Sequence, residues 1–397
     1  MIGALRDHLA ARWADLRPGS PPLRGAIVAG ADKHPSAKVT FLFFDRWGRQ
    51  SVAVKVARDG WSERALVAEH EALTHFWSSG SACIATSVPE PLLLERIQGR
   101  LALVMSALDG EPMMTRYYRP RHTSDPDRVA RDFGMAGEWL RRFQLETQAG
   151  RQELTARSYR RWADPILERY RTEIGWGSVE DELFEAVMDR VTALEGCDIP
   201  LSGVHGDYWT GNLLVSGDRV AGVIDWELGK PEGLPFADLY KFPTSYGFYL
   251  DRAYPAGTAR IPGHPGRDRA RELWSRFGDW PNLVGFGYGY FGQGWFPDLV
   301  RRSVLEHFEY LGVPAAANAV FFPLFLAEQA TAIPDRTFRA GYRALLAGFS
   351  AERSSGWLWA TDGQAASTVK PEPAPQRDRP RGDRPQAVAA AGRGRRW

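Results

Sequence analysis

The stretch VHGDYWTGNLLVSGDRVAGVIDWE, residues 204–227, concentrates side chains that can bind a metal ion or accept a proton. Its apolar runs NLLV and RVAGVI are typical of two strands, and the SGD segment at 216–218 predicts the turn between them. In such an antiparallel hairpin Asn212 begins the first strand and Asp225 ends the second, so both lie at its open end. Asp207 precedes Asn212 by five residues, on the loop that enters the same end. Two carboxylates and an amide oxygen therefore converge, and such ligands suit Mg²⁺.

The same spacing occurs in the catalytic loop of kinases, where Asp, four residues and Asn precede a metal-binding Asp on the next hairpin. Here HGDYWTGN followed by IDWE resembles the aminoglycoside phosphotransferase and choline kinase superfamily, whose pattern is HGDxxxxN and then DWE. The resemblance implies Asp207 as the catalytic base, Asn212 and Asp225 as magnesium ligands, and His205 as a brace for the loop. Asp238 fits the downstream aspartate that holds this loop, and a helix N-terminal cap is an equal alternative.

A nucleotide site of this kind needs a lysine and an acidic partner from the first part of the chain. In SVAVKVA, strand alternation places Ala53 and Lys55 on one face, and VAVK resembles the kinase strand whose lysine reaches the phosphates and whose alanine lies over the adenine. The helical period over 62–77 places Glu69 within an apolar stripe. A carboxylate buried without a partner is strongly disfavoured, so we expect an ion pair between Lys55 and Glu69.

The remaining nucleotide contacts are implied by the resemblance alone. The phosphate-covering loop is expected near residues 30–37, beginning at Gly30, although this segment has no GxGxxG pattern. LALVMSALDG resembles the segment that joins the two lobes, so Met105 would lie beside the adenine. The carbonyl of Ser106 and the amide of Leu108 would bind the adenine edge. An ordinary buried strand and turn is an equal alternative for this segment.

These residues require a scaffold, and the chain predicts one in two parts. Strand patterns near 25–30, 38–44, 51–57, 88–95 and 100–106 surround the helix at 62–77, and from about residue 111 the pattern is mainly helical. We therefore predict an α+β, two-lobed protein-kinase-like fold with a small antiparallel-sheet N-lobe and a larger, mainly helical C-lobe. The expected divisions are an N-terminal helix and linker (1–22), the nucleotide-binding N-lobe (23–108), the C-lobe (109–361) and a disordered basic tail (362–397).

Composition excludes several classes of protein. The formal net charge is +2, but residues 363–397 hold eight Lys/Arg and three Asp/Glu, a charge of +5, so the rest carries −3 and no basic nucleic-acid-binding body is indicated. A tail that binds nucleic acid or a membrane surface is the weaker alternative to a solvated extension. Cys83 and Cys197 form no CxxC pair, which favours a reducing compartment. With no signal-peptide pattern and no apolar run long enough to span a membrane, a cytoplasmic protein is expected.

The predicted reaction moves the γ-phosphoryl group of ATP or GTP, with magnesium, to a hydroxyl of a small molecule such as an aminoglycoside, another antibiotic, a sugar or an amino alcohol. Tyr208, Trp209 and Glu227 adjoin the catalytic residues and are expected to line the acceptor site. The aromatic run at 285–296 could stack an acceptor or simply pack the helical lobe. A nucleotide-binding regulator without turnover is the alternative function, and the oligomeric state is left open.

Overall fold

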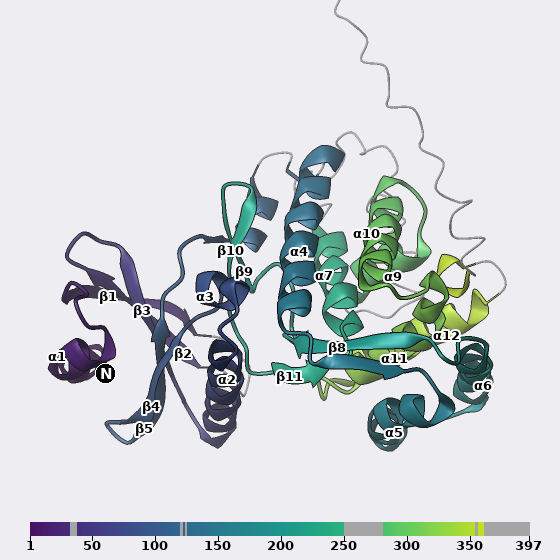
Figure 1. Ribbon diagram of the computed structural model, residues 1–397, viewed down its shortest axis with the longest axis horizontal. Helices are drawn as coiled ribbons and strands as arrows, with labels where there is room; N and C mark the ends of the chain where they lie inside the picture. Colours follow the sequence, from purple (N-terminus) through teal and green to yellow (C-terminus); the bar gives the residue numbers. More distant parts are fainter. Residues whose placement is uncertain (32–37, 120–121, 124, 250–280, 354–355, 361–397) are drawn as a thin grey trace, which may run out of the picture.

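The computed structural model describes residues 1–31, 38–119, 122–123, 125–249, 281–353 and 356–360. Two lobes follow one another along the chain, a small antiparallel sheet with its helices and then a larger helical lobe (Figure 1). The predicted α+β, two-lobed protein-kinase-like arrangement is therefore confirmed. The predicted basic tail and most of the predicted phosphate-covering loop, residues 32–37, lie outside the described residues.

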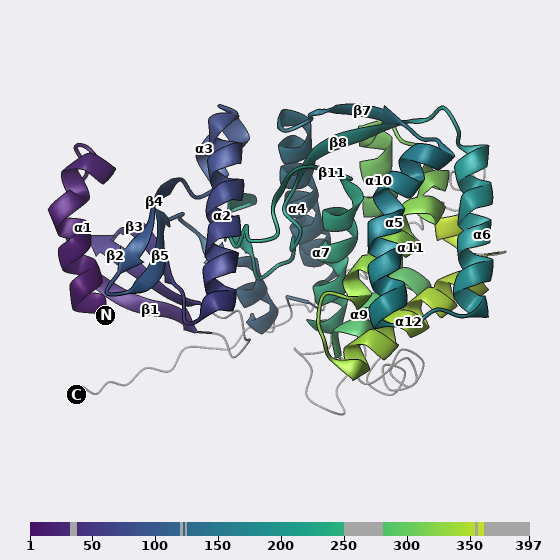
Figure 2. The same cartoon turned by 90° about the horizontal axis from the view of Figure 1, so that it is seen from below.

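The N-lobe sheet has five strands in the order β1-β2-β3-β5-β4, and all neighbours are antiparallel. Its strands are β1 (Leu23–Ala31), β2 (Val39–Asp45), β3 (Gln50–Val56), β4 (Pro91–Ile97) and β5 (Arg100–Ser106). Helices α1 (Ile2–Leu16) and α2 (Gly60–Ser78) lie on opposite sides of this sheet (Figures 1 and 2). The short helix α3 (Ala82–Ser87) connects α2 to β4.

Strand alternation decides which residues of β3 face which helix. Val52 and Val54 are buried in one apolar cluster with Leu9 and Trp13 of α1, so α1 seals the outer face of the sheet. Lys55 points to the other face, toward α2. Helix α2 begins at a capping box in which the side chain of Asp59 accepts hydrogen bonds from the first-turn amides. The cap fixes where the helix starts and therefore which of its residues meet the sheet.

The C-lobe is built mainly from helices. They are α4 (Pro126–Glu146), α5 (Ala156–Glu173), α6 (Ser178–Ala193), α7 (Phe236–Tyr249), α9 (Pro281–Phe291), α10 (Trp295–Leu311), α11 (Asn318–Ala330) and α12 (Arg336–Ala351). Two small sheets complete the lobe: β10-β9-β6, formed by Arg219–Val223, Leu213–Ser216 and Glu111–Pro112, and β11-β8-β7, formed by Lys230–Gly233, Asp198–Val204 and Gly150–Glu153. The second small sheet is absent from the sequence prediction because β7 and β11 have only four residues each and β8 is buried along nearly its whole length, without alternation.

The aromatic run at 285–296 packs the interior of the C-lobe. Phe286, Tyr290 and Phe296 are each at most 1% exposed, and the hydroxyl of Tyr290 donates to the carbonyl of Tyr240 on α7. The structure thus favours core packing over acceptor stacking for these rings. Among the described residues, no single helix is long and apolar enough to cross a membrane, and one sharply bent pair, Trp295–Leu311 with Ala315–Ala330, passes that test jointly.

Candidate active site

The hairpin predicted from the sequence is present and carries its polar residues at the open end. Strands β9 and β10 pair from Leu213 opposite Val223 to Ser216 opposite Arg219. Asn212 stands just before β9, and its carbonyl accepts a hydrogen bond of 3.0 Å from the amide of Ile224, just after β10. Asp225 follows directly. This register holds the proposed magnesium ligands, Asn212 and Asp225, on adjoining ends of two paired strands.

Asp207 is held to the same end of the hairpin by Asn212. The side-chain amide of Asn212 donates to the backbone carbonyl of Asp207 at 2.9 Å and to its Oδ2 at 3.1 Å. With the amide nitrogen used in this way, the amide oxygen of Asn212 is left as an oxygen donor for a cation. The loop geometry therefore ties the proposed base to a proposed magnesium ligand.

Asp238 anchors the loop that carries Asp207. It lies in the first turn of α7 and is fully buried, and its two oxygens accept the amides of His205 at 2.7 Å and Gly206 at 2.8 Å. Of the two alternatives for Asp238, the contacts are those of a loop anchor. Burial raises the pKa of Asp238, and His205 together with these two amides opposes that rise.

His205 braces the loop from inside. It is fully buried, and its Nε2 lies 2.9 Å from the carbonyl of Ile224 at the end of β10. Its ring meets Trp226 edge-on, with centroids 4.6 Å apart. The side chain therefore points to the hairpin and the core.

Lys55 joins the two lobes at the site. Its ammonium lies 2.5 Å from Oε1 of Glu69, which is the expected ion pair, and it also pairs with Asp225 of the C-lobe. Burial opposes the positive charge, but Asp225 and Glu69 outweigh it and raise the pKa of Lys55. Burial likewise opposes ionisation of Asp225, yet Lys55 and then Lys38 lower its pKa to about 2. Asp225 is therefore ionised near neutral pH, and its side chain is 40% exposed.

Lys38 is a site residue that the sequence analysis did not identify. Its Nζ lies 2.5 Å from Oε2 of Glu227 and 3.8 Å from Oε2 of Glu69. The signal was present in the strand pattern, since Thr40 pairs with Lys55 and Lys38 shares the face of Thr40. Glu227 pairs with this N-lobe lysine while its side chain stays 29% exposed, and its expected place in the acceptor site stays a prediction. Glu227 is thus part of the contact between the lobes.

Lys241 is the second residue that was missed. Its Nζ lies 3.3 Å from Oδ1 of Asp207 and donates to Oε1 of Gln329 on α11 at 2.8 Å. Lys241 follows Asp238 by three residues, so the two side chains share one face of α7. The helix that anchors the loop backbone therefore also contacts the carboxylate of the proposed base.

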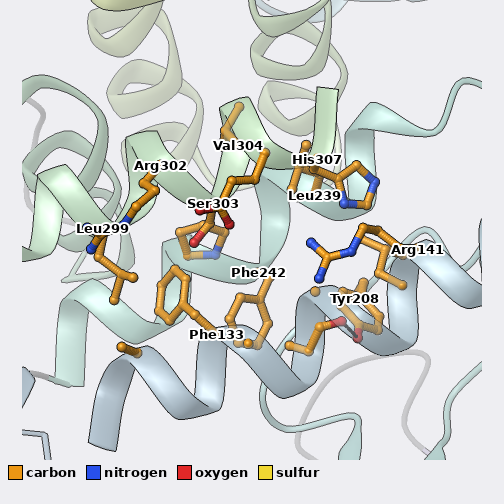
Figure 3. A pocket seen from close by; sticks show the side chains of 17 residues that line it. Phe133, Arg141, Tyr208, Leu239, Phe242, Leu299, Arg302, Ser303, Val304 and His307 are labelled. Atoms are coloured by element: carbon orange, nitrogen blue, oxygen red, sulfur yellow. Dashed lines mark hydrogen bonds between the residues drawn. The ribbon is translucent and has the colours of Figure 1, made fainter. Parts of the chain in front are cut away.

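The expectation that Tyr208 lines the acceptor site is corrected by the structure. Tyr208 is fully buried, its hydroxyl donates to the carbonyl of Ala136 on α4 at 2.8 Å, and its ring stacks on Trp139. Together with Phe242 of α7 it lines a cavity of about 250 Å³ between α4, α7 and α10 (Figure 3). Tyr208 therefore points into the C-lobe, whereas the Asp207 carboxylate meets Lys241.

Trp209 remains half-buried beside the catalytic loop, and its acceptor role stays a prediction. Its ring lies against Gly211, where an added Cβ would come within 2.4 Å of the indole. The absence of a side chain at Gly211 thus lets the indole fold back over the loop.

The expected adenine-binding residues lie where the chain leaves the N-lobe. Ala53 on β3 pairs with Met105 on β5, which is buried. Ser106 exchanges hydrogen bonds with Glu90 through its amide and its hydroxyl, so the end of β5 is firmly held. The side chain of Leu108 packs against Gly222 of β10. Gly30 lies in β1 opposite Thr40, at the edge of the expected phosphate loop.

The donor set fits magnesium. The described residues contain no group of three or more His, Cys, Asp or Glu that would enclose a metal ion. Mg²⁺ does not need such a cage, because it binds one or two protein oxygens and completes its shell with water and substrate phosphates. The exposed carboxylate of Asp225 and the amide oxygen of Asn212 meet that requirement.

Comparison with known proteins places the chain in a family. A family model described as the phosphotransferase enzyme family, APH, matches residues 37–273. A search of curated protein sequences returns no match.

Solved structures similar to the chain include the following three. A Ralstonia eutropha JMP134 protein described as a candidate aminoglycoside phosphotransferase is 16% identical, with 89% of this chain and 97% of that chain covered and a TM-score of 0.49. The aminoglycoside phosphotransferase APH(4)-Ia, in a thermostable mutant complexed with ADP and hygromycin B, is 14% identical, with coverage of 89% and 99% and a TM-score of 0.46. The macrolide 2'-phosphotransferase MphH from Brachybacterium faecium is 19% identical, with coverage of 86% and 97% and a TM-score of 0.41. Because the family model spans more than half of the chain, including the loop of Asp207 and the hairpin after it, the chain belongs to the phosphotransferase enzyme family.

Proposed function

We propose that the protein is a magnesium-dependent small-molecule kinase that transfers the γ-phosphoryl group of ATP or GTP to an acceptor hydroxyl. The observation that carries the proposal is the arrangement around the hairpin: Asp207, Asn212 and Asp225 at its open end, with Lys55 of the other lobe paired to Asp225. Family membership supports the chemistry. In this proposal the acceptor is a small molecule, and the assay described below identifies it.

Each residue has a distinct part in the reaction. Asp207 accepts the proton of the acceptor hydroxyl, so that the hydroxyl oxygen attacks the γ-phosphorus while the bond to the bridging oxygen breaks and the nucleoside diphosphate leaves. Lys55 binds nucleotide phosphate oxygens, oriented by Glu69. Asn212 and Asp225 would hold Mg²⁺, which would neutralise part of the phosphate charge. Lys55 therefore serves the nucleotide, and Asp207 serves the acceptor.

The N-lobe supplies the adenine site in this proposal. Met105 and Ala53 contact the base, the Ser106 carbonyl and the Leu108 amide bind its edge, and Gly30 begins the loop that covers the phosphates. Backbone groups of this kind recognise a purine edge without requiring particular side chains. Adenine and guanine present different donors and acceptors at that edge, so the choice between ATP and GTP is made by direct comparison of the two nucleotides.

A coupled assay of nucleotide consumption tests the proposal. The purified protein is given ATP or GTP with magnesium and a panel of aminoglycosides, macrolides, choline, homoserine and sugars. Acceptor-dependent turnover that Asp207→Asn abolishes is the expected result. Asp218→Asn is the matched control, because Asp218 is exposed in the turn of the same hairpin and its loss should leave turnover unchanged. Magnesium-dependent nucleotide binding without turnover on any acceptor would favour the regulatory alternative.

A further inference from the structure

We propose that Lys241 is a positioning residue for phosphoryl transfer, which holds the carboxylate of Asp207 in the orientation that receives the acceptor proton. This inference rests on the proposed function of Asp207 as the base. Nothing in the linear motif HGDYWTGN indicates it, because Lys241 lies 34 residues farther along the chain. It depends on one contact, the 3.3 Å separation of the Lys241 ammonium from Oδ1 of Asp207.

The two carboxylate oxygens of Asp207 contact two different residues. Oδ2 accepts the side-chain amide of Asn212 at 3.1 Å, and Oδ1 faces Lys241. Asn212 would hold the metal through its amide oxygen, while its amide nitrogen keeps the hydrogen bond to Asp207. With Oδ2 on Asn212 and Oδ1 at the ammonium of Lys241, the carboxylate is held at both oxygens, which restricts its rotation.

Lys241 itself is held in place by the C-lobe. It donates to Oε1 of Gln329 on α11, a residue that is 7% exposed, and its own side chain is only 25% exposed. A lysine that merely kept the surface hydrated would be largely exposed, as is Lys230, whose side chain is 60% exposed even in its surface ion pair with Glu328. Restricting the rotatable bonds of a lysine opposes folding, so an ordered lysine beside a proposed base indicates a role for the charge.

The charge has a use during the reaction as well as before it. When the acceptor O–H bond breaks, its proton moves to Asp207, the new bond forms to the γ-phosphorus, and the electron pair of the broken P–O bond leaves with the nucleoside diphosphate. Asp207 becomes neutral in this step, so the ammonium of Lys241, 3.3 Å from Oδ1, loses its counterion. Its positive charge then stabilises the negatively charged phosphoryl group that reacts at Asp207, without rearrangement.

Substitution of Lys241 tests the role through the division between kcat and KM. Lys241→Met should lower kcat roughly 10- to 100-fold and leave the KM for the magnesium nucleotide within about twofold, because misplacement of a reacting group affects the transition state and not nucleotide binding. Lys241→Arg keeps the charge and should recover a large part of the loss. Lys230→Met is the matched control, because Lys230 pairs at 3.4 Å with Glu328, the neighbour of Gln329. We expect this variant to keep the kcat of the unmodified protein.

The inference is overturned if Lys241→Met retains kcat within twofold of the unmodified protein. It is equally overturned if kcat, nucleotide KM and thermal stability all deteriorate together and arginine restores none of them, since that pattern indicates a purely structural tie between α7 and α11. Failure of the proposed function has a different signature, namely no turnover by the unmodified protein on any acceptor. In that case the pairing of Lys241 with Asp207 is tested by a double-mutant cycle, in which the free energies of unfolding of Lys241→Met, Asp207→Asn and the double variant are measured in denaturant. Additive changes in these free energies refute the pairing, and a coupling energy between the two substitutions supports it.

Discussion

Replacing Gly206 with alanine should damage both the stability and the catalysis of this protein, and the structure sets the size of each effect. Gly206 stands between His205 and Asp207 with φ of +84°, a left-handed conformation that alanine adopts at a cost of roughly 1–2 kcal/mol. An added Cβ would lie 2.6 Å from the backbone oxygen of Leu228 and 2.7 Å from its Cβ. Ordinary contact begins near 3.4 Å, so the loops must separate by 3.4 − 2.6, about 0.8 Å.

This displacement falls between the two halves of the site. Leu228 follows Asp225 by three residues, and Gly206 adjoins Asp207, so relieving the clash moves the proposed base relative to the proposed metal ligand. Overpacking adds roughly 1–3 kcal/mol to the conformational cost, for a total of about 2–5 kcal/mol. A misplacement approaching 1 Å lowers turnover by up to about 100-fold, so we expect kcat to fall about 10- to 100-fold.

Gly217→Ala is the matched control for this change. Gly217 also has a positive φ, +60°, but an added Cβ there meets nothing within 4 Å. Alanine at that position should therefore incur only the conformational cost of roughly 1–2 kcal/mol and leave kcat within about twofold. Free energies of unfolding from denaturant titrations and steady-state kinetics measure both variants. If Gly206→Ala and Gly217→Ala were equally stable and equally active, the steric reasoning about the catalytic loop would be refuted.

Three further changes have expected outcomes. Lys55→Met should lower the free energy of unfolding by roughly 3–5 kcal/mol because it removes the close partner of the buried Glu69, whose other cation, Lys38, lies 3.8 Å away. Arg96→Met at an exposed ion pair should change the free energy of unfolding by less than about 1 kcal/mol in the same titration. Burial lowers the pKa of His307 to about 3. Below pH 6.5 this histidine is therefore protonated in the unfolded chain but still neutral in the folded chain, so the free energy of unfolding falls as the pH drops. From pH 6.5 to 5 the free energy of unfolding should fall by about 1.6 kcal/mol, and His307→Gln should remove this loss. Equal pH slopes in both proteins would contradict this account. Asp207→Ala should abolish transfer with nucleotide binding nearly intact, whereas Asp225→Ala should also weaken binding of the magnesium nucleotide in calorimetry, and equal losses of binding would contradict the division of roles.

Local periodicity explains what could be predicted about the site. Two apolar strand runs around an SGD turn leave one register for the hairpin, and that register alone places Asn212 and Asp225 at the same end. The helical period likewise places Glu69 in the buried stripe of α2, and strand alternation turns Lys55 toward it. In each case the side-chain direction repeats, every two residues in a strand and every 3.6 residues in a helix. The spacing in the sequence is therefore sufficient to predict which side chains share a face.

Side-chain directions in irregular segments, and contacts between elements far apart in the chain, could be learned only from the tertiary structure. The catalytic loop has no period, so nothing in its sequence indicated that Tyr208 turns into the C-lobe while Asp207 turns to Lys241. Lys38 and Glu227 are 189 residues apart, and their ion pair forms only because the two lobes meet at the site. The sequence by itself thus determined which backbone positions carry the proposed chemistry. Only the tertiary structure determined which side chains surround those positions, among them Lys241 of α7, because the contacts between α7, α11 and the catalytic loop join residues far apart in the chain.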